Sequence, residues 1–242
     1  MFKVNFRIGI AAMVVLAGLV STGYAQTITT FDVNGSTYTF PIAINPAGQI
    51  TGLYYGADAI QHGFLRRVDG TFTTFDVTGS INTVPVSINP SGQITGSYWD
   101  KSNRIHGFIR KTDGTFTTFD VVDSTSYPEA INPAGQIAGV YYGSNAVAHG
   151  FVRKADGTFT TFDVTGSTNT LAASINPAGQ ITGYYSDTSN QVHGFLRSAD
   201  GTFTTFGLEG SNLVEPNAIN AAGQITGWYW DSNRTHGFLR SP

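Results

Sequence analysis

The chain has no cysteine among its 242 residues, and only 12% of them are charged. The absence of cysteine excludes disulfides, cysteine-ligated zinc, iron–sulfur clusters and thiol nucleophiles. The net charge of −3 argues against nucleic-acid binding, which relies on basic surface. A helical bundle is excluded as well, because helices favour Ala, Leu, Glu and Lys over the residues that dominate here.

Glycine, threonine and aromatic residues are abundant, with 29 Gly, 17 Phe and 11 Tyr. These residue types are typical of strands joined by tight turns. The hydrophobic fraction of 40% is enough to build a sizeable core. We therefore predict an all-β protein.

Residues 1–25 are predicted to be a cleaved bacterial signal peptide. Lys3 and Arg7 precede a mainly apolar stretch, and Gly23-Tyr24-Ala25 provides a small-residue cleavage site. The uncharged stretch from Ile8 to Val20 is shorter than the roughly 20 residues that span a bilayer. The protein is thus expected to be secreted or periplasmic, with no membrane insertion after cleavage.

From residue 27 onward, one unit is written five times, at 27–70, 71–114, 115–157, 158–201 and 202–242. Each copy contains Thr-x-Thr-Thr-Phe, Ile-Asn-x-x-Gly-Gln-Ile-x-Gly, an aromatic position, a polar loop and His-Gly-Phe. A period of this length with short strands is typical of propellers and solenoids. Residues 26–242 are therefore predicted to form a single five-repeat domain.

Four strands are predicted in each repeat period, for example 84–89, 93–99, 106–111 and 115–121. Asn-Pro-x-Gly and Asp-Gly turns join them into antiparallel hairpins, as in a propeller blade. The chain begins with a fourth-strand sequence at 27–33 and ends after a third strand. We predict a five-bladed β-propeller of four-stranded antiparallel blades in which the N-terminal strand completes the last blade, leaving no exposed edge.

The repeated His-Gly-Phe, followed by an aliphatic residue and Arg, resembles the bacterial extracellular repeat family HAF, named after a His-Ala-Phe signature. The resemblance covers all five units, and this chain departs from it by having Gly at the middle position. It implies an extracellular location and a propeller-like shape. It implies no reaction, because the family has no settled biochemical activity.

All five histidines occupy the same repeat position: His62, His106, His149, His193 and His236. A ring of imidazoles suggests a metal, but each would be separated from the next by a whole blade. We instead predict that each histidine bonds a loop carbonyl or a carboxylate such as Asp76, and we predict no metal and no cofactor. The loop aspartates are likewise too few per loop for calcium.

The loop after the second strand and the linker between blades differ in every copy, which marks the face that is free to specialise. The variable aromatic residue beside this loop can stack on a sugar ring while polar neighbours bond its hydroxyls. The predicted ligand-binding residues are Tyr55, Trp99, Asp100, Arg104, Tyr142, Asp187, Trp230, Asp231 and Arg234.

Two glutamates break the repeat pattern on the first strands. Glu129 replaces Ile, Val, Ala or Asn of the other copies, and Glu215 replaces Phe, Val, Tyr or Leu. First strands line a propeller's channel, so the two carboxyls could form a catalytic pair at its mouth. No nucleophile or oxyanion partner is apparent beside them.

The sequence therefore favours a monomeric, secreted, non-enzymatic recognition module that binds carbohydrate or another surface polymer. One alternative is a polysaccharide hydrolase or lyase that uses Glu129 and Glu215. A second alternative is a structural platform for protein–protein interactions.

Overall fold

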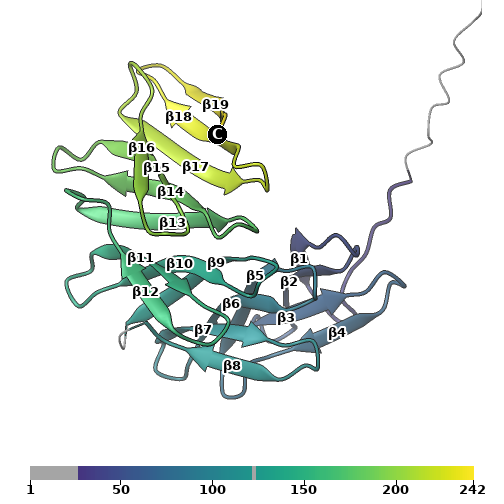
Figure 1. Ribbon diagram of the computed structural model, residues 1–242. Coiled ribbons are helices and arrows are strands. Elements are labelled where there is room, and N and C mark those ends of the chain that lie inside the picture. Colours follow the sequence, from purple (N-terminus) through teal and green to yellow (C-terminus); the bar gives the residue numbers. More distant parts are fainter. Residues whose placement is uncertain (1–26, 122–123) are drawn as a thin grey trace, which may run out of the picture. The chain divides into compact units, whose positions relative to one another are not determined.

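The computed structural model describes residues 27–121 and 124–242 (Figure 1). The predicted signal peptide, 1–25, lies outside the described residues. Contacts divide the chain into Met1–Phe31 and Asp32–Pro242, and all the described strands belong to the second part. No helix able to cross a membrane occurs in the described ranges.

The described residues form strands and turns without helices. The strands are β1 (Tyr38–Ile44), β2 (Ile50–Tyr55), β3 (Gln61–Arg66), β4 (Phe72–Phe75), β5 (Asn82–Ile88), β6 (Ile94–Trp99), β7 (Ile105–Arg110), β8 (Phe116–Phe119), β9 (Thr125–Ile131), β10 (Ile137–Tyr142), β11 (Ala148–Arg153), β12 (Phe159–Phe162), β13 (Asn169–Ile175), β14 (Ile181–Ser186), β15 (Val192–Arg197), β16 (Phe203–Phe206), β17 (Leu213–Ile219), β18 (Ile225–Trp230) and β19 (Thr235–Arg240).

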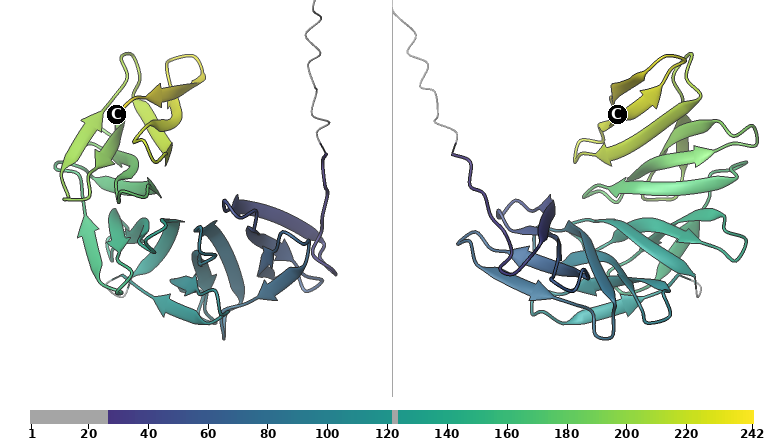
Figure 2. Two further views of the ribbon diagram at one scale, coloured as in Figure 1. Left: turned by 45° about the vertical axis from the view of Figure 1, so that its right-hand side comes forward. Right: turned by 180° about the vertical axis from the view of Figure 1, so that it is seen from behind.

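The strands form antiparallel sheets in chain order, which confirms the predicted all-β, four-stranded repeat. We call them sheet 1 (β1–β4), sheet 2 (β5–β8), sheet 3 (β9–β12), sheet 4 (β13–β16) and sheet 5 (β17–β19). A single parallel bridge between Val192 and Leu213 joins sheets 4 and 5. Successive sheets follow one another with their first strands in contact (Figure 2).

Each first strand contains a bulge where it faces the invariant glycine of the second strand. The ladder skips one residue in every copy, and in β9 the skipped residue is Glu129. A Cβ on Gly96 would lie 2.1 Å from the carbonyl oxygen of Val84, so only glycine fits opposite the bulge. Bulges re-aim side chains next to functional sites. The corresponding bulged residues in the other copies are Ile42, Val86, Ala173 and Asn217.

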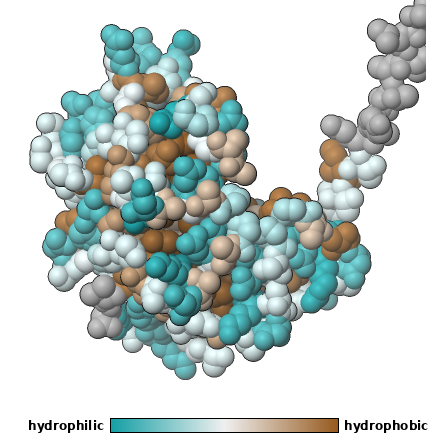
Figure 3. Space-filling model, in the orientation of Figure 1, coloured by the Kyte–Doolittle hydropathy of each residue, from teal (hydrophilic) through white to brown (hydrophobic). Residues whose placement is uncertain are grey.

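The hydrophobic core lies between successive sheets rather than within any one of them. Between sheets 2 and 3, Phe119 and Val121 pack with Ile137 and Phe151, and Phe151 is completely buried. The Arg153 guanidinium lies 5.2 Å from the centre of the Phe119 ring, across the same junction. Apolar surface accordingly appears between hydrophilic rims in the space-filling view (Figure 3).

An asparagine from each turn between the first and second strands reaches into the next sheet. The Asn45 amide Nδ2 donates to the carbonyl of Asn89 at 3.2 Å, and Asn89 donates to that of Asn132 at 3.3 Å. The series continues from Asn132 to Asn176 and from Asn176 to Asn220. The sequence indicated only a turn role for these residues, so this link between sheets is a finding of the structure.

At the two ends of the series, the predicted pairing of 27–33 with the last sheet stays a prediction. Residues 27–33 form no strand, and β19 pairs only with β18 among the described residues, so sheet 5 has three strands. Apolar residues on the two outermost sheets are exposed: Ile44 is 66% exposed whereas its equivalent Ile88 is 7% exposed, and Leu239 is 68% exposed.

Replacing Asn132 with alanine should lower the free energy of unfolding by about 2–4 kcal/mol, because several buried hydrogen bonds are lost together. Its amide donates to Gln136 and Asn176, and its oxygen accepts from the Gln136 backbone. Urea unfolding monitored by tryptophan fluorescence measures the loss. The exposed Asn233→Ala is the control, and an equal loss in both variants would contradict the role of Asn132.

Candidate functional site

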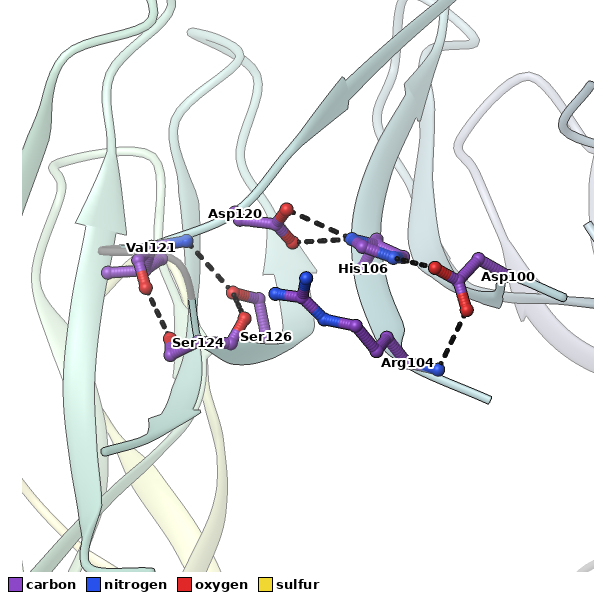
Figure 4. A network of polar contacts seen from close by, with 7 residues as sticks. All are labelled: Asp100, Arg104, His106, Asp120, Val121, Ser124 and Ser126. Carbon is purple, nitrogen blue, oxygen red and sulfur yellow. Dashed lines mark hydrogen bonds and ion pairs between the residues drawn. The ribbon is translucent and has the colours of Figure 1, made fainter. Parts of the chain in front are cut away.

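The histidines hold each sheet's own loop in place. Nδ1 of His62 lies 2.8 Å from Oδ2 of Asp76, which confirms the predicted partner. His106 contacts Asp120 through Nδ1 and the loop residue Asp100 through Nε2 (Figure 4). Burial lowers the pKa of His62, but the hydrogen bonds of its two aspartates raise it overall.

The histidine ring also stacks on the invariant tyrosine of the second strand, at 5.0 Å between Tyr98 and His106. In the ranges that the structure describes, no group of three or more His, Asp or Glu side chains could hold a metal ion. The histidines thus stabilise the loop face without forming a shared ligand set.

The loop aspartates predicted to bind ligand are engaged in their own loops. Oδ1 of Asp100 accepts from the backbone of Ser102 and Arg104, and its other oxygen faces His106. Asp187 and Asp231 are held in the same way. Backbone hydrogen bonds, followed by His236, lower the pKa of Asp231 to about 2. These carboxylates give the loops a fixed shape, and a direct ligand contact by them stays a prediction.

A pocket of about 620 Å³ lies between sheets 2 and 3 on the loop face. Two predicted residues from different sheets meet there, Arg104 from the β6–β7 loop and Tyr142 from the end of β10. The Tyr142 ring is 37% exposed and meets Tyr127 edge-on at 5.8 Å. The rest of the lining is polar or aromatic: Ser124, Thr125, Tyr141, Gly143, Ser144, Asn145 and His149.

A second pocket, of about 310 Å³, occupies the equivalent place between sheets 4 and 5. Gln191 takes the repeat position of Arg104, and Trp230 takes that of Tyr142. Trp230 is 42% exposed, and Ser211, Asn212 and Ser232 supply polar groups. The repeat therefore builds the same kind of pocket twice, with different side chains in it.

Six of the nine predicted residues are not among the lining of these two pockets: the three loop aspartates, and Tyr55, Trp99 and Arg234. Tyr55 accepts a hydrogen bond from Gln61 at 2.6 Å and meets the ring of Phe40. Trp99 pairs with Asn82 in the ladder of sheet 2, and Arg234 lies exposed in the β18–β19 loop. Their proposed contacts with a ligand remain predictions.

A third pocket, of about 290 Å³, lies on the first-strand side of sheets 3 to 5. Glu129 enters it from the bulge of β9, opposite Tyr184 of β14 and Asn217 of β17. Desolvation in this hollow raises the pKa of Glu129 to about 7, although the side chain keeps contact with solvent. Glu215 has a raised pKa for the same reason.

Tyr184 links the two glutamates electrostatically. Burial raises its pKa first, and the charges of Glu215 and Glu129 raise it further. The predicted pair of carboxyls is thus grouped around one tyrosine, although only Glu129 lines the pocket. The sequence signal for this site was the break in the repeat pattern, and the participation of Tyr184 was missed.

Comparison with known proteins shows the fold and no more. No family model and no curated protein matches the chain. TolB from Acinetobacter baumannii superposes with a TM-score of 0.61 at 12% identity, over 84% of this chain and 52% of that one. This chain therefore spans about half the length of that protein.

A putative TolB from Agrobacterium tumefaciens gives a TM-score of 0.63 at 12% identity, over 85% of this chain and 77% of the other. A triple arginine mutant of AofleA from Arthrobotrys oligospora gives 0.52 at 13% identity, over 85% and 70%. These are β-propeller-type folds, and the chain shares their architecture.

Glu129→Gln should stabilise the protein at about pH 8 and leave it unchanged at about pH 4. The folded pKa of about 7 exceeds the ordinary 4.5, so ionisation lowers the free energy of unfolding as pH rises through that window. Because the side chain reaches solvent, we expect a gain of about 1 kcal/mol. Urea unfolding at both pH values measures it, with the exposed Glu209→Gln as control. An equal shift at both pH values would contradict the burial effect.

Proposed function

We propose that the chain is a secreted or periplasmic recognition module of the HAF type, without enzymatic activity, that binds a carbohydrate or a related surface polymer. The observation that carries this proposal is the recurrence of one pocket at two equivalent junctions, each with an exposed aromatic ring. Tyr142 and Trp230 offer apolar faces, and the Ser, Asn, Gln and Arg side chains around them offer hydrogen bonds. This combination suits sugar rings with their hydroxyls.

Two similar pockets on one rigid scaffold favour a repeating polymer over a single small ligand. Weak binding at each pocket becomes strong when both engage the same chain. An Asp–His contact holds the loop that contributes to each pocket, Asp100 with His106 at 3.3 Å and Asp187 with His193 at 2.9 Å. Pre-formed pockets of this kind bind with little ordering cost.

Tyr142→Ala and Trp230→Ala should each weaken binding by about fivefold, and the double variant should lose most of it. The assay is a broad glycan panel followed by titration of the best ligand with the exported protein. Ser186 takes the aromatic position between sheets 3 and 4, so Ser186→Ala is the matched control. No binding across the panel by folded protein would refute the recognition proposal.

The hydrolase or lyase alternative is less well supported by the first-strand pocket. A carboxylate pair acts when both groups flank the reacting bond at a set separation. Glu129 is the one carboxyl among the residues that line the pocket, and its neighbours Val140 and Leu171 are apolar. We therefore assign Glu129 to binding rather than to catalysis.

The recognition module is also proposed to be a closed, five-bladed and monomeric propeller. Val33, the last residue of the predicted N-terminal strand, is 3% exposed. Its N–H donates to Thr39 at 3.2 Å, as that of Val77 donates to Thr83 after the fourth strand of sheet 1. The chain therefore enters sheet 1 as if it came from a preceding fourth strand.

The opposite end supports the same closure. In the described part of the chain, Asn220 donates only to Gln224 and has no acceptor in a following sheet. Its repeat position would direct it to the Asn45 carbonyl of sheet 1. Pairing of 27–33 with β19 would supply the missing fourth strand and bury Leu239, whose equivalent Leu65 is 5% exposed.

A double variant, Ile28→Cys with Arg240→Cys, should form an intramolecular disulfide in the folded protein. By repeat equivalence with Phe72 and Arg66, these residues are opposed across the proposed ladder. The chain has no other cysteine, so mass spectrometry of the oxidised protein is unambiguous. Thr29→Cys with Arg240→Cys, one residue out of register, should cross-link far less. Equal cross-linking of both pairs, or only intermolecular bonds, would contradict closure.

A further inference from the structure

The first-strand pocket differs from the loop-face pockets in the residues that line it. The repeat positions that build it carry different residues in each copy. Tyr184 replaces Leu53, Ser97, Val140 or Trp228, and Glu129 stands at the bulge where other copies have Ile42, Val86, Ala173 or Asn217. Its chemistry is therefore specific to sheets 3 to 5, although the scaffold beneath is shared.

The pocket combines one carboxyl, one phenol, one amide and apolar walls. Glu129, Tyr184 and Asn217 come from three different sheets and converge on the same space of about 290 Å³. Val140, Leu171, Ala172 and Ala173 form the remaining surface. Pockets with apolar walls and a few convergent polar groups are typical ligand sites.

The pocket lacks a positive charge of its own. Within residues 27–121 and 124–242, every ion pair joins a histidine to an aspartate, and none involves Glu129 or Glu215. The charged groups that raise the pKa of Tyr184 are Glu215, Tyr142 and Glu129. The pocket lining therefore holds one acidic group and no basic one.

We infer that this pocket binds the ammonium group of a small organic cation. The Glu129 carboxylate supplies the counter-charge, and the Tyr184 ring supplies a π-face, which attracts quaternary and primary ammonium groups. The apolar walls accept the carbon atoms next to the charge. A divalent metal is a poorer match, because one carboxyl and one amide provide too few oxygen ligands.

Electrostatics around the pocket add a second reason. Desolvation raises the pKa values of Glu129, Glu215 and Tyr184, although Glu129 is exposed to solvent. A bound cation would stabilise those anionic forms. The inference concerns a site separate from the loop-face pockets, so it does not rest on the proposed recognition of carbohydrate.

The test is calorimetric titration of the exported protein with tetramethylammonium chloride at about pH 8, at constant ionic strength, with tert-butanol as the uncharged probe of similar shape. We expect saturable binding of one cation per chain and no binding of the alcohol. Glu129→Ala should weaken it by about tenfold or more, and Tyr184→Leu by about threefold. Both replacements introduce the residue of another repeat, Ala173 or Leu53, so the fold should tolerate them.

The matched control is Glu209→Gln, which removes an exposed carboxyl elsewhere and should leave binding unchanged. Circular dichroism of each variant establishes that it is folded. If Glu129→Ala binds the cation as tightly as the unmodified chain, or if the alcohol binds equally well, the inference is wrong. Absence of saturable binding to the unmodified chain would overturn it too, whatever the glycan panel shows.

Discussion

The hydrogen bond from each turn asparagine to the next sheet is the contact on which the arrangement depends. The Asn89 side chain closes its own turn by accepting from the Gln93 backbone, and its amide reaches the carbonyl of Asn132. One buried side chain, 1% exposed, thus sets both the hairpin and its distance from the neighbouring hairpin. Because an unpaired buried amide is costly, a sheet that shifts relative to its neighbour loses both functions together.

The glycine opposite each bulge is the second constraint, and in β9 the bulge places Glu129 in the first-strand pocket. Gly139 allows the β9 carbonyl and the Phe151 ring to approach closely, and a Cβ there would meet the Tyr127 oxygen at 2.3 Å. The bulge that this glycine accommodates gives Glu129 its place in the pocket. A feature that every repeat needs for packing therefore leaves one side chain per repeat free to vary.

The sequence predicted the strands well, because turn residues and strand residues recur with one period. The predicted strand 106–111 and the observed β7, Ile105–Arg110, differ by one residue at each end. The contact of His62 with Asp76 was predicted too, because the two residues are only 14 positions apart in the chain, on either side of one predicted hairpin. Fold class and repeat unit were thus readable from local patterns.

The sequence could not predict contacts that join different sheets. A turn is sufficient reason for an asparagine at this position, so no sequence feature indicated its hydrogen bond to the next sheet. The contacts of the loop aspartates with the loop backbone and with His106 or His193 were likewise not predicted. The N-terminal strand depends on the partner at the far end of the chain, and no local pattern determines whether that pairing occurs.

The open outer surfaces of sheets 1 and 5 are two halves of the junction that the chain already makes four times internally. Such a contact is heterologous, since each half fits the other and not itself. A chain whose ends are not paired with each other therefore exposes an apolar surface on sheet 1 and a complementary apolar surface on sheet 5. Through Ile44 on one surface and Leu239 on the other, it would add to further copies without limit. Ring closure in this protein would act as a termination step that prevents fibre growth.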